Sequence, residues 1–181
     1  MALPLLGGCR ADGSIGLRML RRSLTVIALV AFGAAAGLAL HLATAEGDTM
    51  FAGKRPDYLG VKDGRLASCR KRLNCVSSRA DPADTQRYVA PIAFTGGAAE
   101  AIAAARRAVE SMPRATVVRQ DGNYLYAEFR SKLFGFVDDV EFTCDEKAGV
   151  LHVRSASRLG RRDYGVNRKR VEALRARIGR K

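Results

Sequence analysis

ATVVRQDGNYLYAEFRSKLFGFVDDVEFTCDEKAGVLHVRSASR, residues 115–158, alternates apolar and polar residues along most of its length. Alternation with a period of two is typical of β-strands that bury one face. Asp121-Gly122 and the DEKAG segment, residues 145–149, are typical of turns between such strands. The stretch therefore predicts four antiparallel strands joined by short connections.

The turn of the first hairpin predicts its register. With Asp121-Gly122 as a two-residue loop, Gln120 pairs with Asn123. One face of the hairpin is then apolar, because Thr116 and Val118 lie opposite Ala127 and Leu125. The other face carries Arg119, Tyr124, Tyr126, Glu128 and Arg130.

Three carboxylates interrupt the third predicted strand, within the sequence GFVDDVEF. Alternation places Asp139 and Glu141 on the face opposite to the apolar side chains. Arg154 and Arg158 of the next strand share that face, and Arg154 lies opposite Glu141 or Asp139 in either register that keeps the apolar residues together. Asp138 has the parity of the core face, so either a bulge turns it outward or it binds a buried group.

Two helices are predicted beside the strands. Thr95 is a good N-cap for a helix with apolar residues at helical spacing, which Pro113 ends. A short strand over residues 88–94 precedes it, and an amphipathic helix from about 163 to 178 follows the strands. The predicted fold class is α+β, a two-layer arrangement in which two helices pack on a mainly antiparallel sheet of four to five strands. One N-terminal transmembrane or signal helix precedes this domain.

The N-terminus indicates export. LTVIALVAFGAAAGLALHLATA, residues 24–45, has no formal charge, and its length of about 22 residues is enough to cross a bilayer as a helix. Arginines precede it and acids follow it, so the positive-inside rule leaves residues 1–23 in the cytoplasm, with Met19 as an alternative start. Residues 46–58 form a linker, and residues 59–181 form the exported α+β domain.

The apolar segment has two alternative fates. Ala43 and Ala45 give it the small-x-small form of a signal-peptidase site, and cleavage after Ala45 would yield a soluble periplasmic protein. The apolar run exceeds the usual signal-peptide length of roughly 7 to 15 residues, which favours a retained anchor. We therefore expect a single-pass inner-membrane protein with its C-terminal domain in the periplasm.

Two of the four cysteines lie close together in CRKRLNC. In an oxidising compartment, Cys69 and Cys75 favour a local disulfide that closes a short loop. Metal binding is the alternative, but two thiols without a neighbouring histidine fall short of a zinc ligand set. Cys144 is expected to be a buried, small apolar residue. No metal and no cofactor are expected.

LNCVSS, YAEFRS, GFVDDVEF, RSASRLG and GVNRKR follow one another in this order between residues 73 and 170. Together they resemble the bacterial and plastid family catalogued as domain of unknown function 1499, over roughly Leu59 to Ile178. Members of that family typically have prolines in the cysteine loop, where Arg70 and Leu73 stand here. The resemblance implies an export or membrane segment, and it brings no activity and no catalytic residue.

Basic residues gather toward the C-terminus of a chain whose formal net charge is +13. Residues 154–181 hold eleven Lys and Arg against Asp163 and Glu172, which indicates an anionic partner. The alternative is that Arg154 and Arg168 close an internal salt-bridge network with Asp139, Glu141 and Asp163. Guanidinium groups and the amides at the start of the last helix predict an anion cradle. Its residues are Arg154, Arg158, Asn167, Arg168, Lys169 and Arg170.

These patterns favour a non-catalytic domain, tethered to the membrane or periplasmic. Export disfavours nucleic acid, whereas anionic lipid headgroups suit a membrane-tethered basic domain. An assembly factor that binds a membrane protein is a further possibility. A serine triad is disfavoured, because the histidines are His41 in the apolar segment and His152 on a polar strand face. An enzyme that uses Asp138, Asp139 and Glu141 with the basic residues is the alternative, and no catalytic residue is assigned.

Overall fold

The computed structural model describes residues 51–70 and 72–179. The predicted cytoplasmic segment, the apolar helix over residues 24–45 and the cleavage site after Ala45 lie outside these ranges. The chain divides into two compact units, Met1–Gly47 and Asp48–Lys181, and every described residue belongs to the second. Within the described ranges, no helix is long and apolar enough to cross a bilayer.

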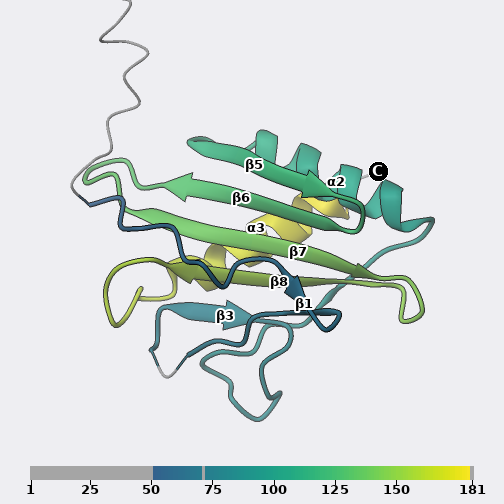
Figure 1. The fold of residues 1–181 in the computed structure, drawn as a ribbon, viewed down its shortest axis with the longest axis horizontal. Helices are drawn as coiled ribbons and strands as arrows, with labels where there is room; N and C mark the ends of the chain where they lie inside the picture. The colour runs from purple at the N-terminus through teal and green to yellow at the C-terminus, as the bar shows by residue number, and fades with distance from the viewer. Residues whose placement is uncertain (1–50, 71, 180–181) are drawn as a thin grey trace, which may run out of the picture. The chain divides into compact units, whose positions relative to one another are not determined.

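A six-stranded sheet forms the centre of the described domain (Figure 1). Neighbouring strands follow the order β3-β8-β7-β6-β5, and β4 pairs with β8 off this path. All these pairings are antiparallel. A separate two-stranded ribbon pairs β1 with β2. The strands are β1 Val61–Lys62, β2 Arg65–Leu66, β3 Cys75–Ser77, β4 Ile92–Ala93, β5 Ala115–Asp121, β6 Tyr124–Arg130, β7 Val137–Asp145 and β8 Val150–Ser157.

The α+β class and the mainly antiparallel sheet are confirmed, while the sheet is wider than the predicted four to five strands. The additional strand is β3, which is not among the strands predicted from the sequence. The predicted strand over residues 88–94 shortens to the two residues of β4. Strands of two or three residues contain too few positions for alternation to be recognised, so only their pairing with β8 defines them.

Two helices pack on one face of the sheet, α2 Ala98–Glu110 and α3 Val166–Ile178 (Figure 1). The predicted N-cap Thr95 is wrong, because Gly97 occupies that position and makes no side-chain cap. Gly96 has a φ of 103°, a conformation that glycine tolerates, and it turns the chain just before the helix. The fully buried core between helices and sheet includes Ile102, Val109, Leu125, Val140, Phe142, Leu151, Val153, Val171 and Leu174.

The predicted register of the β5–β6 hairpin is wrong by one residue at the turn. Asp121 pairs with Tyr124, so the two loop residues are Gly122 and Asn123. The register shifts again between Val117 and Arg119, where a β-bulge inserts Val118. As a result Val117 packs against the core and Val118 is exposed, while the faces predicted for β6 are unchanged.

The opposite face of the sheet is polar, and it is covered by the segment that enters the domain. Residues 51–66 run in front of the sheet in Figure 1, whereas the helices lie behind it. Leu59 and Leu66 of this segment pack against Tyr124 and Tyr126 of β6. The polar face is therefore enclosed rather than open to solvent, and its charged groups need partners inside the domain.

Candidate functional site

Arg154 and Glu141 form the most deeply buried ion pair of the polar face. They lie directly opposite each other on β8 and β7, as one of the two predicted registers requires. Arg154 Nη1 is 3.0 Å from Glu141 Oε2, and the two side chains are 2% and 0% exposed. Glu141 Oε1 also accepts hydrogen bonds from the hydroxyl of Tyr124 at 2.9 Å and from the amide of Gly60 at 2.8 Å. Three elements thus hold one carboxylate.

A second ion cluster lies beside this pair. Glu128 and Asp139 face each other on β6 and β7, an arrangement of like charges that is unfavourable without a cation. Arg158 Nη2 lies 2.5 Å from Glu128 and 2.8 Å from Asp139, and Arg55 binds Glu128 at 2.6 Å. Burial raises the pKa of Glu128, but hydrogen bonds from Arg55, Tyr126 and Arg158 outweigh it, so the pKa lies below its ordinary value. The carboxylate therefore stays ionised at neutral pH.

Asp138 points to the helix side of the sheet, as its strand parity predicts. No bulge interrupts β7 at this position, because the pairing with both neighbouring strands is continuous. Its partner is Arg170 of α3, whose Nη2 lies 2.5 Å from the carboxylate and whose guanidinium lies over the ring of Phe129. The three acids of GFVDDVEF are therefore divided between two faces, each is paired with a guanidinium, and none lines any of the five best-defined pockets of the described residues.

The six residues of the predicted anion cradle are not brought together. Arg154 and Arg158 point into the polar face, whereas Arg170 acts from the helix side. Arg168 donates to main-chain oxygens of the loop before β4, so it has a structural role rather than the predicted pairing with Asp139, Glu141 or Asp163. Lys169 is exposed on α3. The sheet separates these groups, and no single ligand can contact all of them.

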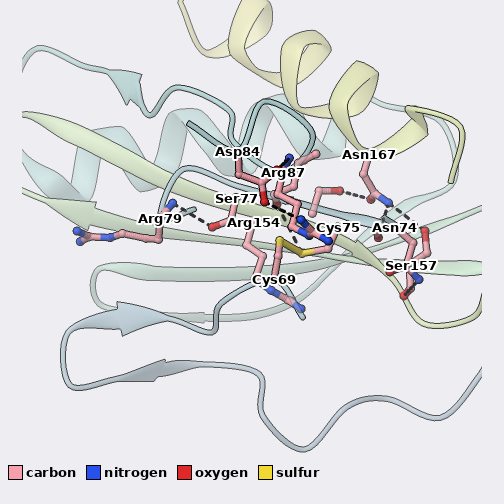
Figure 2. The surroundings of a disulfide bond; sticks show 12 residues. Cys69, Asn74, Cys75, Ser77, Arg79, Asp84, Arg87, Arg154, Ser157 and Asn167 are labelled. Atoms are coloured by element: carbon pink, nitrogen blue, oxygen red, sulfur yellow. Dashed lines mark hydrogen bonds and ion pairs between the residues drawn. A yellow bond between two sulfur atoms is a disulfide. The ribbon is translucent and has the colours of Figure 1, made fainter. Parts of the chain in front are cut away.

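Asn167, the sixth cradle residue, is fully buried and joins three segments. Its amide group donates to the carbonyl oxygen of Asn74 at 3.1 Å and to Ser157 Oγ at 2.9 Å, and its oxygen accepts from Ser155 Oγ at 2.5 Å. Asn74 in turn donates to the carbonyl oxygen of Gly160 at 2.8 Å. Figure 2 shows Asn74, Ser157 and Asn167 turned toward one another. These residues of three sequence motifs form a structural joint.

A basic pocket with a volume of about 360 Å³ opens beside Arg154. Its walls come from the covering segment Lys54–Tyr58, from the loop that contains the cysteines, and from β8. Most of its charged lining is cationic, with Asp57 as an acid within it. The cations of this basic pocket are Lys54, Arg55, Arg70, Arg72, Arg154 and Arg158.

The cations of the basic pocket differ in how far they are already neutralised. Arg55 and Arg158 bind acids, as described above, and Arg70 lies over the ring of Tyr58 at 4.6 Å. Lys54 and Arg72 are exposed and make no ion pair or side-chain hydrogen bond with any described residue. Arg154 Nε is buried and finds no acceptor among residues 51–70 and 72–179. Cationic groups therefore remain available in a concave site.

The predicted disulfide between Cys69 and Cys75 is confirmed. It closes the loop that carries Arg70 and Arg72, and Cys75 pairs with Ala156 of β8. Figure 2 shows the disulfide next to Arg154. The covalent bond therefore attaches the outer wall of the basic pocket to the sheet. In the described part of the chain, no group of three or more His, Cys, Asp or Glu side chains is arranged to hold a metal ion.

His152 lies close to a serine and an acid, an arrangement that sequence reasoning did not anticipate. Its Nδ1 is 3.1 Å from Ser78 Oγ, and its Nε2 is 4.0 Å from Asp145. Burial, and then the nearby charge of Arg79, lower the pKa of His152. Ser78 Oγ accepts a hydrogen bond from the amide of Val153, and neither Ser78 nor His152 lines any of the five best-defined pockets of the described residues. Both side chains are buried, so the contact is explained by packing of β8 against the segment that follows β3.

Sequence reasoning identified Arg154 and Arg158 but missed the other four cations that line the basic pocket among the described residues. Arg70 and Arg72 stand in the sequence CRKRLNC, where three consecutive basic residues within a closed loop were an available signal. Lys54 and Arg55 lie in the segment predicted to be a linker, and only the fold shows that this segment crosses the polar face.

A family model described as a protein of unknown function (DUF1499) matches residues 65–178. The match covers more than half of the chain. The chain belongs to the DUF1499 family. No curated protein matches the chain. The DUF1499 region supplies Arg70, Arg72, Arg154 and Arg158 to the basic pocket, whereas Lys54 and Arg55 precede it. The pocket is thus built from the family domain and from the segment that leads into it.

Proposed function

We propose that the protein is a non-catalytic, membrane-tethered DUF1499 domain that binds a phosphate-bearing anion in the basic pocket. The observation that carries the proposal is the concentration of cations around a concave site in which Lys54 and Arg72 have no acid partner among the described residues. Arg154 Nε, which is buried without an acceptor, supplies a further donor at the wall of this site.

Phosphate suits the chemistry of the basic pocket. Guanidinium groups present planar pairs of N–H donors that match phosphate oxygens, and Lys54 adds a mobile point charge. Arg55, Arg154 and Arg158 are already neutralised by carboxylates, so they hold the shape of the pocket. The net attraction comes from the remaining cations, and it decreases as salt screens exposed charges.

The membrane tether is the predicted apolar segment of residues 24–45, which precedes the DUF1499 domain in the chain. We place the domain in the periplasm and the anchor in the inner membrane, with cleavage after Ala45 as the alternative. Extraction of membranes with alkaline carbonate distinguishes the two. A retained anchor keeps the protein in the pellet. A cleaved protein appears in the soluble periplasmic fraction, and its mass is that of a chain whose first residue is Glu46.

Isothermal titration of inorganic phosphate into the fragment Asp48–Lys181 tests the pocket. This fragment is the second compact unit of the chain, and its apolar core is complete within the described residues. The change Arg72→Glu should weaken phosphate binding by about tenfold, the effect of losing about 1.4 kcal/mol of attraction. Arg72 is exposed and makes no ion pair or side-chain hydrogen bond with any described residue, so the melting temperature should remain near that of the parent.

The matched control is Lys147→Glu, which makes the same charge reversal in the exposed turn between β7 and β8. It should leave phosphate affinity within about twofold, because long-range attraction is screened. An equal loss in both variants would reject the pocket in favour of a general effect of net charge.

A parallel experiment uses vesicles with and without phosphatidylglycerol. If the protein binds phosphatidylglycerol vesicles and soluble phosphate competes with them, the ligand is a lipid headgroup. If the protein binds soluble phosphate but not the vesicles, a lipid headgroup is excluded.

An enzyme that uses Asp138, Asp139 and Glu141 is the alternative. All three carboxylates bind guanidinium groups, and none lines any of the five best-defined pockets of the described residues. No contact of these acids therefore favours catalysis over the structural role that the ion pairs give them. An assembly role would instead predict a membrane-protein partner that purifies with the full chain.

A further inference from the structure

The loop between β6 and β7 exposes large apolar side chains. Leu133 is 83% exposed and Phe134 is 57% exposed. The rings of Phe51, Phe134 and Phe136 contact one another, with centroids separated by 5.5 to 6.1 Å. We name Phe51, Leu133, Phe134 and Phe136 the apolar tip. A contiguous exposed group of this kind is typical of an interaction site rather than of an ordinary protein surface.

The apolar tip is held in place by its own loop. The amide of Ser131 donates to the carbonyl oxygen of Phe136 at 2.9 Å, and the amide of Phe136 donates to Ser131 Oγ at 3.0 Å. Gly135 has a φ of 68°, which allows the tight reversal between the two phenylalanines. Because the loop is closed by these bonds, little ordering is needed before the tip binds a partner.

The position of the apolar tip indicates which partner it meets. The described chain begins at Phe51 beside the β6–β7 loop, at the end of the sheet where β7 starts and β8 finishes (Figure 1). The predicted membrane segment ends at Ala45, six residues earlier in the chain. Six extended residues span at most about 20 Å, so an anchored chain keeps Phe51 within this distance of the bilayer.

Charge around the apolar tip suits an anionic membrane surface. Lys132 is exposed and directly precedes Leu133 in the same loop. Arg161 and Arg162 are exposed on the loop that follows β8, and strand direction places that loop at the same end of the sheet. Cations beside apolar side chains are typical of protein surfaces that enter the interface of anionic bilayers.

We propose that the apolar tip inserts into the interfacial region of the bilayer that anchors the chain. Phe134 and Leu133 enter the boundary between headgroups and acyl chains, while Lys132 remains among the headgroups. The domain then lies against the membrane in a fixed orientation instead of moving freely on its tether. The inference rests on the membrane tether of the proposed function, and it does not depend on the basic pocket.

Tryptophan fluorescence tests insertion directly, because the chain contains no tryptophan. Phe134→Trp in the fragment Asp48–Lys181 should show a blue-shifted emission when vesicles of phosphatidylcholine and phosphatidylglycerol are added, and brominated acyl chains should quench it. Val118→Trp is the matched control, because Val118 is an exposed apolar residue on the edge strand β5. Its emission should not change. Unchanged emission from Phe134→Trp, or an equal response from both variants, would overturn the inference.

Sedimentation with the same vesicles gives a second measure. Leu133→Ser combined with Phe134→Ser should lower vesicle binding by at least about tenfold, since burial of even one such side chain is worth that factor. Val61→Ser, another exposed apolar position, should leave binding unchanged. A blue shift of Phe134→Trp that depends on protein concentration without vesicles would show that a second copy covers the tip, and it would overturn the inference.

The failure of this inference is distinguishable from failure of the basic pocket. Arg72→Glu should weaken phosphate binding by about tenfold and leave the vesicle-induced blue shift of Phe134→Trp in place. Loss of the blue shift in the Arg72→Glu background would contradict a separate role for the apolar tip. Phosphate binding that depends on Arg72, without any blue shift, would reject the tip and retain the pocket.

Discussion

The two faces of the central sheet are both buried, but they differ in what they bury. The helix-covered face encloses apolar side chains such as Val140, Phe142 and Val153. The face covered by residues 51–66 encloses the ion pair of Glu141 and Arg154 together with the neighbouring cluster. Apolar burial stabilises without defined partners, whereas a buried charge is tolerated only when each group is paired. On the polar face, loss of a single partner should therefore lower the stability of the fold, because it leaves a buried charge unpaired.

Charged groups of the polar face and of the adjacent basic pocket differ in whether they have a partner of opposite charge. Glu141, Asp139 and Glu128 are saturated by guanidinium groups and hydroxyls, so these acids hold the architecture together. At the border of the same face, Lys54 and Arg72 have no acid partner among the described residues. The candidate site is therefore identified by cations that the internal ion pairs do not neutralise.

The comparison of the faces predicts the largest effect for Arg154→Ala. This change leaves Glu141 buried without its cation, and we expect a loss of about 3 to 5 kcal/mol in the free energy of unfolding, measured with denaturant. Arg154→Met combined with Glu141→Gln removes both charges and should recover most of this loss, because a neutral pair needs no counter-ion. If the double variant is as unstable as Arg154→Ala, unpaired charge is not the reason.

Loss of the disulfide should have the next largest effect, at the edge of the polar face. Cys69→Ser with Cys75→Ser releases a short loop, and the entropy of closing it is worth about 2 kcal/mol. The same change should weaken phosphate binding, since Arg70 and Arg72 lie within that loop. Unfolding and titration with and without a reducing agent measure both effects in the parent protein. Unchanged phosphate affinity after reduction would show that the loop does not shape the pocket.

A conservative change on the apolar face should cost less. Phe142→Leu keeps an apolar side chain in a fully buried position, and we expect a loss of about 1 to 2 kcal/mol in the free energy of unfolding. The measurement is denaturant unfolding beside Arg154→Ala. A greater loss for Phe142→Leu than for Arg154→Ala would reverse the comparison between the faces.

The smallest predicted effect is the dependence of stability on pH through His152. Burial, followed by the charge of Arg79, lowers the pKa of the folded state from the ordinary 6.5, while Asp145 raises it in part. The unfolded chain therefore binds the proton more readily, and stability should fall as the pH decreases below 6.5. Between about pH 7.5 and about pH 5.5 the loss should be at most about 1 kcal/mol. His152→Gln should remove this slope, and an unchanged slope would assign it to another group.

A strand could be predicted from the sequence when its alternation of apolar and polar residues was long enough to be recognised. The long strands β6, β7 and β8 alternate over seven to nine residues, so their faces were predictable and the partner of Arg154 was limited to Glu141 or Asp139; the structure selects Glu141. The register of the β5–β6 hairpin was not, because Gly122-Asn123 and Asp121-Gly122 are both acceptable turns and the bulge at Val118 has no local signature. The strand β3 was missed because three residues contain too little periodicity.

The candidate site was predictable only in part for a similar reason. Arg154 and Arg158 were identified from strand parity, and the disulfide from its spacing and the expected compartment. The cradle that combined them with Asn167 and Arg170 assumed that nearby residues in sequence share a face. The sheet separates them, because Arg170 reaches Asp138 on the helix side and Asn167 is occupied with Asn74.

The sequence by itself determined the family, the α+β class, the faces of the long strands and the disulfide, because each depends on composition, spacing or period along a continuous stretch. Only the tertiary structure decided that residues 51–66 cover the polar face, that Arg70 and Arg72 join Lys54 around one pocket, and that Phe51 meets the β6–β7 loop. These contacts join segments far apart in the chain, and no local pattern encodes which distant surfaces will meet.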